Sequence, residues 1–210
     1  MLKKLAALLL ATLLFIPAAL ADTPNLLDFL SSLGSLGSSK PDESLSEEQR
    51  LQIIYEMMNA ELDAENIQYE TVPDQQGSYY SLLFESETPM GDRADIDMLA
   101  YWDGVAICAS YRDPIADEHF DEIVRFCNLM NSSLYIGKLY LCEYADGNYL
   151  CYEVFLPMDA AALNDYDRYS VMEYAYFSAQ ILEVYQEYFM YVLEGETAAN
   201  AYAMWYADAE

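Results

Sequence analysis

Histidine and basic residues are scarce in this chain of 210 residues, and their scarcity excludes several functions. The chain has one histidine, His119, and nine lysines and arginines against 36 aspartates and glutamates. A Cys–His or Ser–His catalytic pair would therefore have a single possible base. The formal net charge of −27 leaves no basic patch for phosphates, so nucleic acid is excluded as a partner. An anionic membrane surface is excluded on the same ground.

Sequence motifs that indicate a cofactor or a metal are missing as well. The 8 glycines form neither a G-x-G-x-x-G pattern nor a P-loop. Four cysteines are present, nine or more residues apart: Cys108, Cys127, Cys142 and Cys151. Zinc ligands usually come at shorter spacing, and acidic pairs such as Asp95 with Asp97 lack the glycine and the distal glutamate of a calcium loop. We predict no cofactor, no dedicated metal site and no catalytic residue.

His119 and Cys127 lie where ordinary structural roles are expected. His119 falls among acidic residues at the start of a predicted helix and off its apolar stripe, which favours a solvated side chain. Cys127 lies on that stripe, where a packed thiol is far commoner than a nucleophile.

The first 21 residues have the pattern of a secretory signal peptide. Lys3 and Lys4 supply the positive start, residues 5–16 are apolar, and Ala19-Leu20-Ala21 suits cleavage before Asp22. A retained anchor is the alternative, although the apolar stretch is shorter than the roughly 20 residues of a bilayer span. We expect a secreted or periplasmic protein that does not contact the membrane after cleavage.

The remaining sequence divides into three parts. Residues 22–45 are rich in serine and glycine and predict a flexible linker. Residues 46–195 alternate helix and strand patterns and predict one α+β domain. Residues 196–210 predict a loose C-terminal tail.

Helix signals occur at three places in the predicted domain. Ser46 and Gln49 form a capping box before a first helix, with an apolar stripe at Leu51, Ile54, Tyr55, Met58 and Leu62. Asp113-Pro114 predicts the start of a second helix, with a stripe at Phe120, Ile123, Val124, Cys127 and Met130. A third, long helix is predicted over 168–193, with Gly195 as its C-terminal cap.

Strand patterns fill the intervals between these helices. Strands are predicted over 67–72, 79–85, 96–102, 105–111, 135–145 and 148–157. Asp103-Gly104 and Asp146-Gly147 are the favoured residue pairs of two-residue hairpin turns. Tight turns join antiparallel neighbours, so we predict an antiparallel sheet of about five to six strands with helices over at least one face.

One stretch of the sequence resembles the YbjN-like family, whose fold is similar to type III secretion chaperones. It runs from Phe126 to Leu141, with two asparagines three apart, Asn128 and Asn131, then Gly137, a basic residue and alternating apolar residues. The resemblance covers about residues 46–195. It implies a non-enzymatic, protein-interaction type of fold and no agreed site residue. Type III chaperones work in the cytosol, whereas this chain has an export pattern.

The two cysteines of the last hairpin are candidates for a disulfide, which an oxidising compartment permits. If Asp146-Gly147 forms the turn, Cys142 lies opposite Cys151 at a non-hydrogen-bonded pair. The Cα atoms of such a pair are about 4.5 Å apart, near the short end of disulfide geometry. We predict a cross-strand disulfide that stiffens the hairpin. Two reduced thiols packed side by side are the alternative.

The same alternation divides the hairpin into two faces. Leu139, Leu141, Leu150, Val154 and Leu156 share the predicted core face. The other face carries both cysteines and the aromatic residues Tyr140, Tyr144, Tyr149 and Phe155, which predict a contact surface unless other elements cover it. Tyrosines around the third helix fit either a dimer contact or an amphipathic helix.

These observations favour an exported binding or adaptor protein that holds a protein or peptide, or another copy of itself. The acidity fits either solubility outside the cell or docking of a basic partner. A secreted hydrolase that uses acidic residues is the alternative, and it requires a pocket with converging carboxylates. A small-molecule sensor would require a closed apolar cavity.

Overall fold

The computed structural model describes residues 45–73, 79–87, 93–111, 114–144 and 147–209. The predicted signal peptide lies outside these residues, and so does the predicted linker apart from Leu45. The chain divides into two compact units: Pro41–Tyr202 is one, and the chain from Ala203 onward belongs to the other. The sheet and the site described below belong to the first unit.

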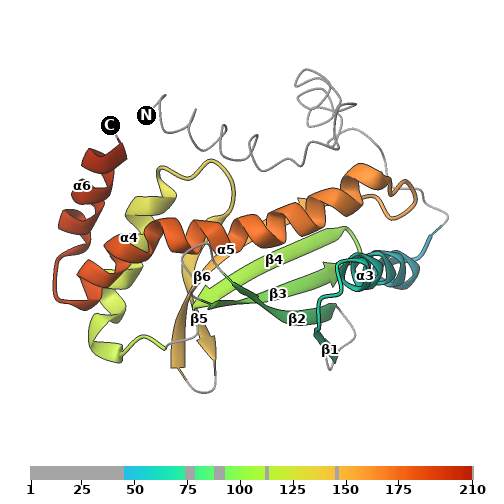
Figure 1. The fold of residues 1–210 in the computed structure, drawn as a ribbon, viewed down its shortest axis with the longest axis horizontal. Coiled ribbons are helices and arrows are strands. Elements are labelled where there is room, and N and C mark those ends of the chain that lie inside the picture. The colour runs from blue at the N-terminus through green and yellow to red at the C-terminus, as the bar shows by residue number, and fades with distance from the viewer. Residues whose placement is uncertain (1–44, 74–78, 88–92, 112–113, 145–146, 210) are drawn as a thin grey trace. The chain divides into compact units, whose positions relative to one another are not determined.

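A six-stranded antiparallel sheet forms the centre of this unit, in the strand order β1-β2-β3-β4-β6-β5 (Figure 1). The strands are β1 (Glu70–Pro73), β2 (Tyr80–Glu87), β3 (Arg93–Tyr101), β4 (Gly104–Tyr111), β5 (Lys138–Tyr144) and β6 (Gly147–Pro157). Each strand pairs antiparallel with its neighbours. The predicted α+β class and its antiparallel sheet are confirmed.

Helices cover one face of this sheet. They are α3 (Glu47–Ala64), α4 (Phe120–Asn131), preceded by the short η1 (Asp117–His119), and α5 (Asp165–Leu193). The helix α5 contacts β4 and β6, α3 contacts β3, and α4 contacts β5, while α5 also contacts α3 and α4. The core lies between these helices and the sheet, with fully buried side chains such as Ile54, Ile96, Met98, Ile107, Phe126 and Met130.

Both long helices begin at side-chain caps. The capping box of α3 is confirmed, because the Ser46 hydroxyl accepts from the Gln49 N–H (3.2 Å) and the Gln49 side chain accepts from the Ser46 N–H (2.9 Å). Asn164 and Asp167 form the same box at the start of α5. At its other end Gly195 donates to the Val192 carbonyl with φ 103°, as a capping glycine does.

Three predictions about the helices need correction. Asp113 lies outside the described residues, and Ile115 does not open a helix but donates to the Asn148 carbonyl (2.7 Å). The helix α4 therefore begins later than predicted, at Phe120, which is 39% exposed, and Phe126 is buried in its place. The predicted loose tail instead contains α6 (Ala198–Ala209), since its alanines have the highest helix propensity.

Both Asp-Gly hairpins turn one residue earlier than predicted. Gly104 pairs with Tyr101, and Gly147 pairs with Tyr144, so each glycine is the first residue of the strand after the turn. A Cβ on Gly104 would lie 2.3 Å from the Leu156 carbonyl oxygen and 2.7 Å from the Phe155 ring. Glycine is required at position 104 because another strand comes close, and not for the turn, where the sequence pattern places Asp103-Gly104.

The junction between α4 and β5 is fixed by two side chains. The Asn131 amide donates to the Leu139 carbonyl (2.8 Å) and accepts from the Leu139 N–H (2.7 Å). The fully buried Tyr152 donates its hydroxyl to the Ile136 carbonyl (2.8 Å). Gly137 takes φ 71° beside this ring, where a Cβ would lie 2.3 Å from the tyrosine oxygen. These contacts fix the position of the chain where β5 begins.

Replacing Asn131 with alanine should destabilise the protein by about 1–3 kcal/mol, because a buried backbone N–H and C=O lose their partner. Asn128, one turn earlier and exposed, is the matched control. Its alanine variant should change the free energy of unfolding by less than about 0.5 kcal/mol. Equilibrium urea unfolding measures both values. Equal effects of the two variants would contradict this role of Asn131.

Candidate functional site

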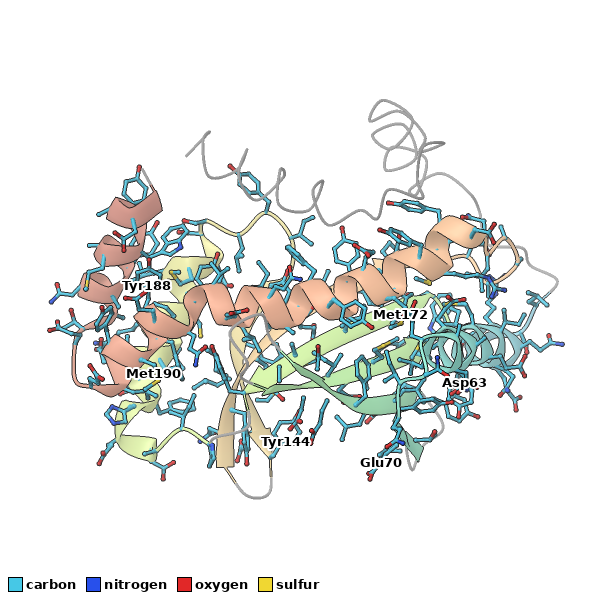
Figure 2. The ribbon with its side chains drawn as sticks, viewed as in Figure 1. Asp63, Glu70, Tyr144, Met172, Tyr188 and Met190 are labelled. Atoms are coloured by element: carbon cyan, nitrogen blue, oxygen red, sulfur yellow. The ribbon has the colours of Figure 1, made fainter. Side chains whose placement is uncertain are left out.

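The strand register assigns a defined set of side chains to the sheet face that points away from the helices, here called the open face. Its central members, from β3, β4, β6 and β5, are Asp95, Asp97, Leu99, Tyr101, Ala106, Cys108, Ser110, Tyr149, Cys151, Glu153, Phe155, Lys138, Tyr140, Cys142 and Tyr144. Figure 2 shows Tyr144 on the side of the sheet away from α5. The predicted division of the hairpin into a core face and an aromatic face is confirmed.

Aromatic side chains gather at both ends of the open face. At one end, Tyr101 lies between Tyr79 and Phe155, with ring centroids 5.7 and 6.4 Å away. At the other end, Tyr144 and Tyr149 meet edge to face at 5.5 Å. Phe155 is 45% exposed and Tyr144 is 48% exposed. The sequence prediction included the second group and Phe155, and it missed Tyr79, which directly precedes β2, and Tyr101 on β3. The same alternation of side chains places both on this face.

The charged side chains described on the open face are predominantly acidic. Glu70 on β1 and Glu85 on β2 lie on it, together with Asp95, Asp97 and Glu153. Lys138 is the basic side chain among them, and its ammonium pairs with Glu153 at 3.0 Å. The face therefore has a negative potential between its two aromatic ends.

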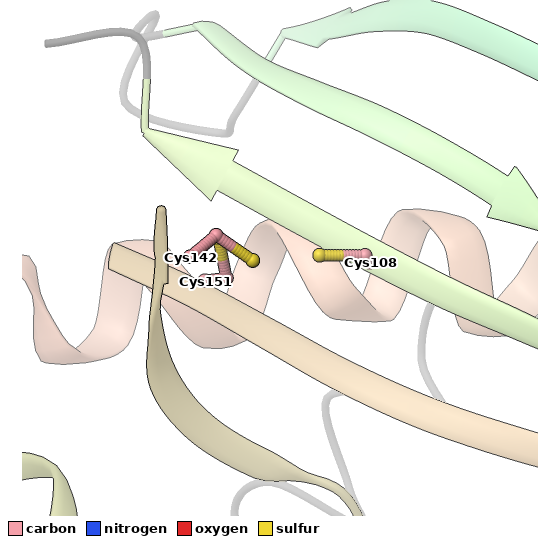
Figure 3. Close-up of side chains that lie close together, drawn as sticks. All are labelled: Cys108, Cys142 and Cys151. Carbon is pink, nitrogen blue, oxygen red and sulfur yellow. The ribbon is translucent and has the colours of Figure 1, made fainter. Parts of the chain in front are cut away.

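Three cysteines meet at the centre of the open face (Figure 3). Cys108, Cys142 and Cys151 come from β4, β5 and β6, and their Sγ atoms all lie within 4.8 Å of one another. Cys108 and Cys151 are buried, while Cys142 is half-buried. Spacing along the chain gave no sign of this cluster, because three strands that are adjacent in the sheet bring together residues far apart in sequence.

The predicted strand register, with Cys142 directly opposite Cys151, is wrong. Because the turn lies one residue earlier, Cys142 pairs with Tyr149 and Cys151 pairs with Tyr140. The two cysteines are diagonal neighbours on the open face. All four cysteines are free thiols in this structure, so a disulfide between Cys142 and Cys151 stays a prediction.

The close approach of the thiols changes their acidity. Hydrogen bonds from Cys108 and then Cys151 hold the pKa of the Cys142 thiol below its ordinary value. The hydrogen bond with Cys142 raises the pKa of Cys108, and hydrogen bonds with Cys108 and Cys142 raise that of Cys151. Cys142 is therefore the thiol that ionises first. Burial alone raises the pKa of Cys127, which lies on α4, to about 12.

A chain of polar contacts leads from the thiols to the edge of the sheet. The Tyr140 hydroxyl lies 3.5 Å from the Cys108 sulfur and donates to Glu153 (2.8 Å), which pairs with Lys138. Burial is the largest cause that raises the pKa of the Tyr140 phenol. Next to the cluster, Asp97 accepts from the Ser81 hydroxyl, and burial raises the pKa of this carboxyl.

Within the part of the chain that the structure describes, the other candidate residues do not gather into a second site. A groove of about 580 Å³ between α4 and the start of α6 contains one carboxylate, Glu122. The Ala198 N–H and then Arg125 lower the pKa of Glu122. The described residues that line this groove include no second carboxylate, whereas the predicted type of hydrolase needs a pair. His119 faces Glu118 at 3.5 Å. The helix α5 exposes Tyr169 and Tyr176 but buries Tyr185.

Comparison with known proteins returns one likeness of fold. The chain is similar to the crystal structure of YbjN from E. coli, a proposed transcription regulator, with 12% identity and a TM-score of 0.45. The match covers 63% of this chain and 93% of YbjN. No family model and no curated protein matches the sequence. The similar structure belongs to the family that the sequence resembles, and nothing about function follows from a likeness of this size.

A membrane-spanning helix must be long and apolar enough to cross a bilayer, and this requirement applies to each helix that the structure describes. None of them combines the necessary length and apolar character.

Thiol labelling should distinguish the four cysteines of the folded, native chain. Cys142 should react first with iodoacetamide, at least about tenfold faster than the buried Cys108, Cys127 and Cys151, which require local opening. Peptide mapping by mass spectrometry identifies the labelled residue, and Cys127 serves as the internal control. Labelling of Cys127 as fast as Cys142 would contradict the described burial. Labelling of both Cys142 and Cys151 only after reduction, with Cys108 unaffected, would establish the disulfide.

Proposed function

We propose that this protein is a non-enzymatic binding module whose open face docks a basic segment of a partner protein that also contains apolar residues. The observation that supports this most directly is the one-sided cover of the sheet, with α3, α4 and α5 on the same face. Exposed aromatic side chains on the other face are typical of contact surfaces, where tyrosine and phenylalanine are enriched and tyrosine is often among the few residues that dominate binding.

Charge identifies the chemistry of the partner. Among the side chains that the structure describes, the open face offers five acidic ones from β1, β2, β3 and β6 against Lys138, which is already paired with Glu153. The whole chain has a net charge of −27. A second copy of the chain would be repelled at this face, whereas a basic segment would be attracted and oriented.

Two aromatic groups separated by an acidic centre match a segment in extended conformation. Apolar side chains of the partner would contact the Tyr101 and Phe155 end and the Tyr144 and Tyr149 end. Lysine or arginine side chains between them would approach Asp97 and Glu153. Such a mixed surface gives affinity through the aromatic contacts and selectivity through the charges.

Two labelled peptides test this proposal by fluorescence anisotropy with the purified chain: one alternates lysine with leucine, and the other alternates glutamate with leucine. The basic peptide should bind, and the Y144S/F155S double variant should weaken its binding at least about tenfold, or about 1.4 kcal/mol. Y135S is the matched control, because Tyr135 is 76% exposed in the loop before β5 and lies off the open face.

Salt gives a second readout of the same complex. Raising the ionic strength from about 0.1 M to about 1 M shortens the Debye length from about 10 Å to about 3 Å. The affinity of the protein for the basic peptide should therefore fall. The docking proposal is wrong if both peptides bind equally well, or if Y135S has the same effect as the double variant.

We place this activity outside the cytoplasm, with residues 1–21 as an export signal. Expression of the full chain in a bacterial host should yield a periplasmic product that begins at Asp22, as found by N-terminal sequencing. Leu9→Arg should block processing, because a charge interrupts the apolar run. A chain that keeps Lys3 and Lys4 and stays in the cytoplasm would refute export.

A further inference from the structure

The cluster of three thiols is a feature that peptide docking does not use. Cys108, Cys142 and Cys151 come from three different strands, and their sulfur atoms converge to within 4.8 Å. A sheet face that only contacts a partner has no need of three converging thiols, since cysteine packs equally well alone. Convergence of three soft donors is instead the arrangement of a metal site.

We propose that Cys108, Cys142 and Cys151 together bind one thiophilic metal ion, Zn(II) or Cu(I), through three sulfur ligands. The sulfur separations agree with such a site. Metal–sulfur bonds of about 2.3 Å place sulfur ligands about 3.8 Å apart in a tetrahedral site and about 4.0 Å apart in a trigonal one. Rotation of the cysteine side chains that moves each sulfur atom by less than about 1 Å converts the observed arrangement into either geometry.

The scaffold holds two of the ligands in place before an ion arrives. Cys108 pairs with Glu153 and Cys151 pairs with Ser110, so both lie on the central strands β4 and β6. Their buried side chains have little freedom, and ligands on strands are placed more exactly than ligands on loops. Cys142 on the edge strand β5 is half-buried, so an ion can enter on its side of the cluster.

The donor atoms decide the class of ion. Calcium and magnesium prefer oxygen ligands in larger number, whereas three thiolates select Zn(II) or Cu(I). His119, the one histidine of the chain, belongs to η1 and faces Glu118, and it therefore adds no nitrogen ligand to the cluster. Zn(II) would retain an open fourth position for water, while Cu(I) is satisfied by three sulfurs.

Polar groups around the thiols suit an ion that is bound by thiolates. Each ligand loses its proton to solvent on binding, so three thiolates leave the loaded site with a net negative charge. The Lys138 ammonium, which lies 5.0 Å from the centre of the Tyr140 ring and pairs with Glu153, offsets part of that charge. Such outer partners adjust the affinity of a metal site and orient its ligands.

The experiment uses the reduced full chain under anaerobic conditions. Zn(II) is titrated in competition with a chromophoric chelator, and Cu(I) in a parallel titration. The chain should bind one ion, and the tighter of the two titrations identifies the metal. Cys142→Ser should weaken binding by more than about 100-fold, because loss of an outer partner alone costs about 10- to 100-fold.

Cys127→Ser is the matched control, since Cys127 is also buried but lies on α4 outside the cluster, and it should bind as the unaltered chain does. A second measurement needs no variant: the bound ion should slow alkylation of Cys142, and a chelator should restore the rate. The proposal is overturned if neither ion binds, if the Cys142→Ser variant binds the ion normally, or if the ion leaves the rate of Cys142 alkylation unchanged. None of these outcomes alters peptide docking, which depends on Tyr144 and Phe155.

Discussion

The antiparallel register of β4, β6 and β5 determines the chemistry of the open face. Side chains alternate between faces along every strand, so a slip of one residue would exchange the core face and the open face. The observed register places the fully buried Leu150 and Tyr152 toward the helices. It thereby turns Cys151 and Glu153 outward, opposite Tyr140 and Lys138. The aromatic groups and the thiol cluster on the open face therefore follow from the register that buries the core residues on the other face.

The entry into β5 is the point where this register is fixed. Leu139 lies on the edge strand β5, and the Asn131 side chain forms hydrogen bonds with both its N–H and its C=O. These two bonds replace those that a neighbouring strand would form. Tyr152 reaches over from β6 to hold the Ile136 carbonyl, and Gly137 leaves room for its ring. The contacts of Asn131 on α4 and of the buried Tyr152 therefore fix the same register of β5 against β6.

The sequence allowed much of the fold to be predicted and little of the site. The capping box at Ser46 and the alternation of Leu139 with Tyr140 are local signals, and both gave the correct result. The Asp-Gly pairs predicted both turns one residue too late. Gly104 and Gly147 are needed because other parts of the chain come close to them, and the local sequence pattern cannot show these neighbours. The thiol cluster depends on the order of β4, β6 and β5 in the sheet, which spacing along the chain does not encode.

Burial on the open face distinguishes it from an ordinary solvent face. Asp97 and the thiols of Cys108 and Cys151 are polar groups withdrawn from water, although no described helix covers them. Withdrawal costs free energy unless partners compensate, and the pKa of Asp97, which burial raises, records that cost. For Cys108 and Cys151 the hydrogen bonds with neighbouring thiols raise the pKa first, and burial adds to the rise. A surface that served only solubility would instead extend its carboxylates into water. Perturbed groups that cluster between aromatic side chains are typical of functional sites, and the arrangement is explained if a ligand supplies the missing compensation.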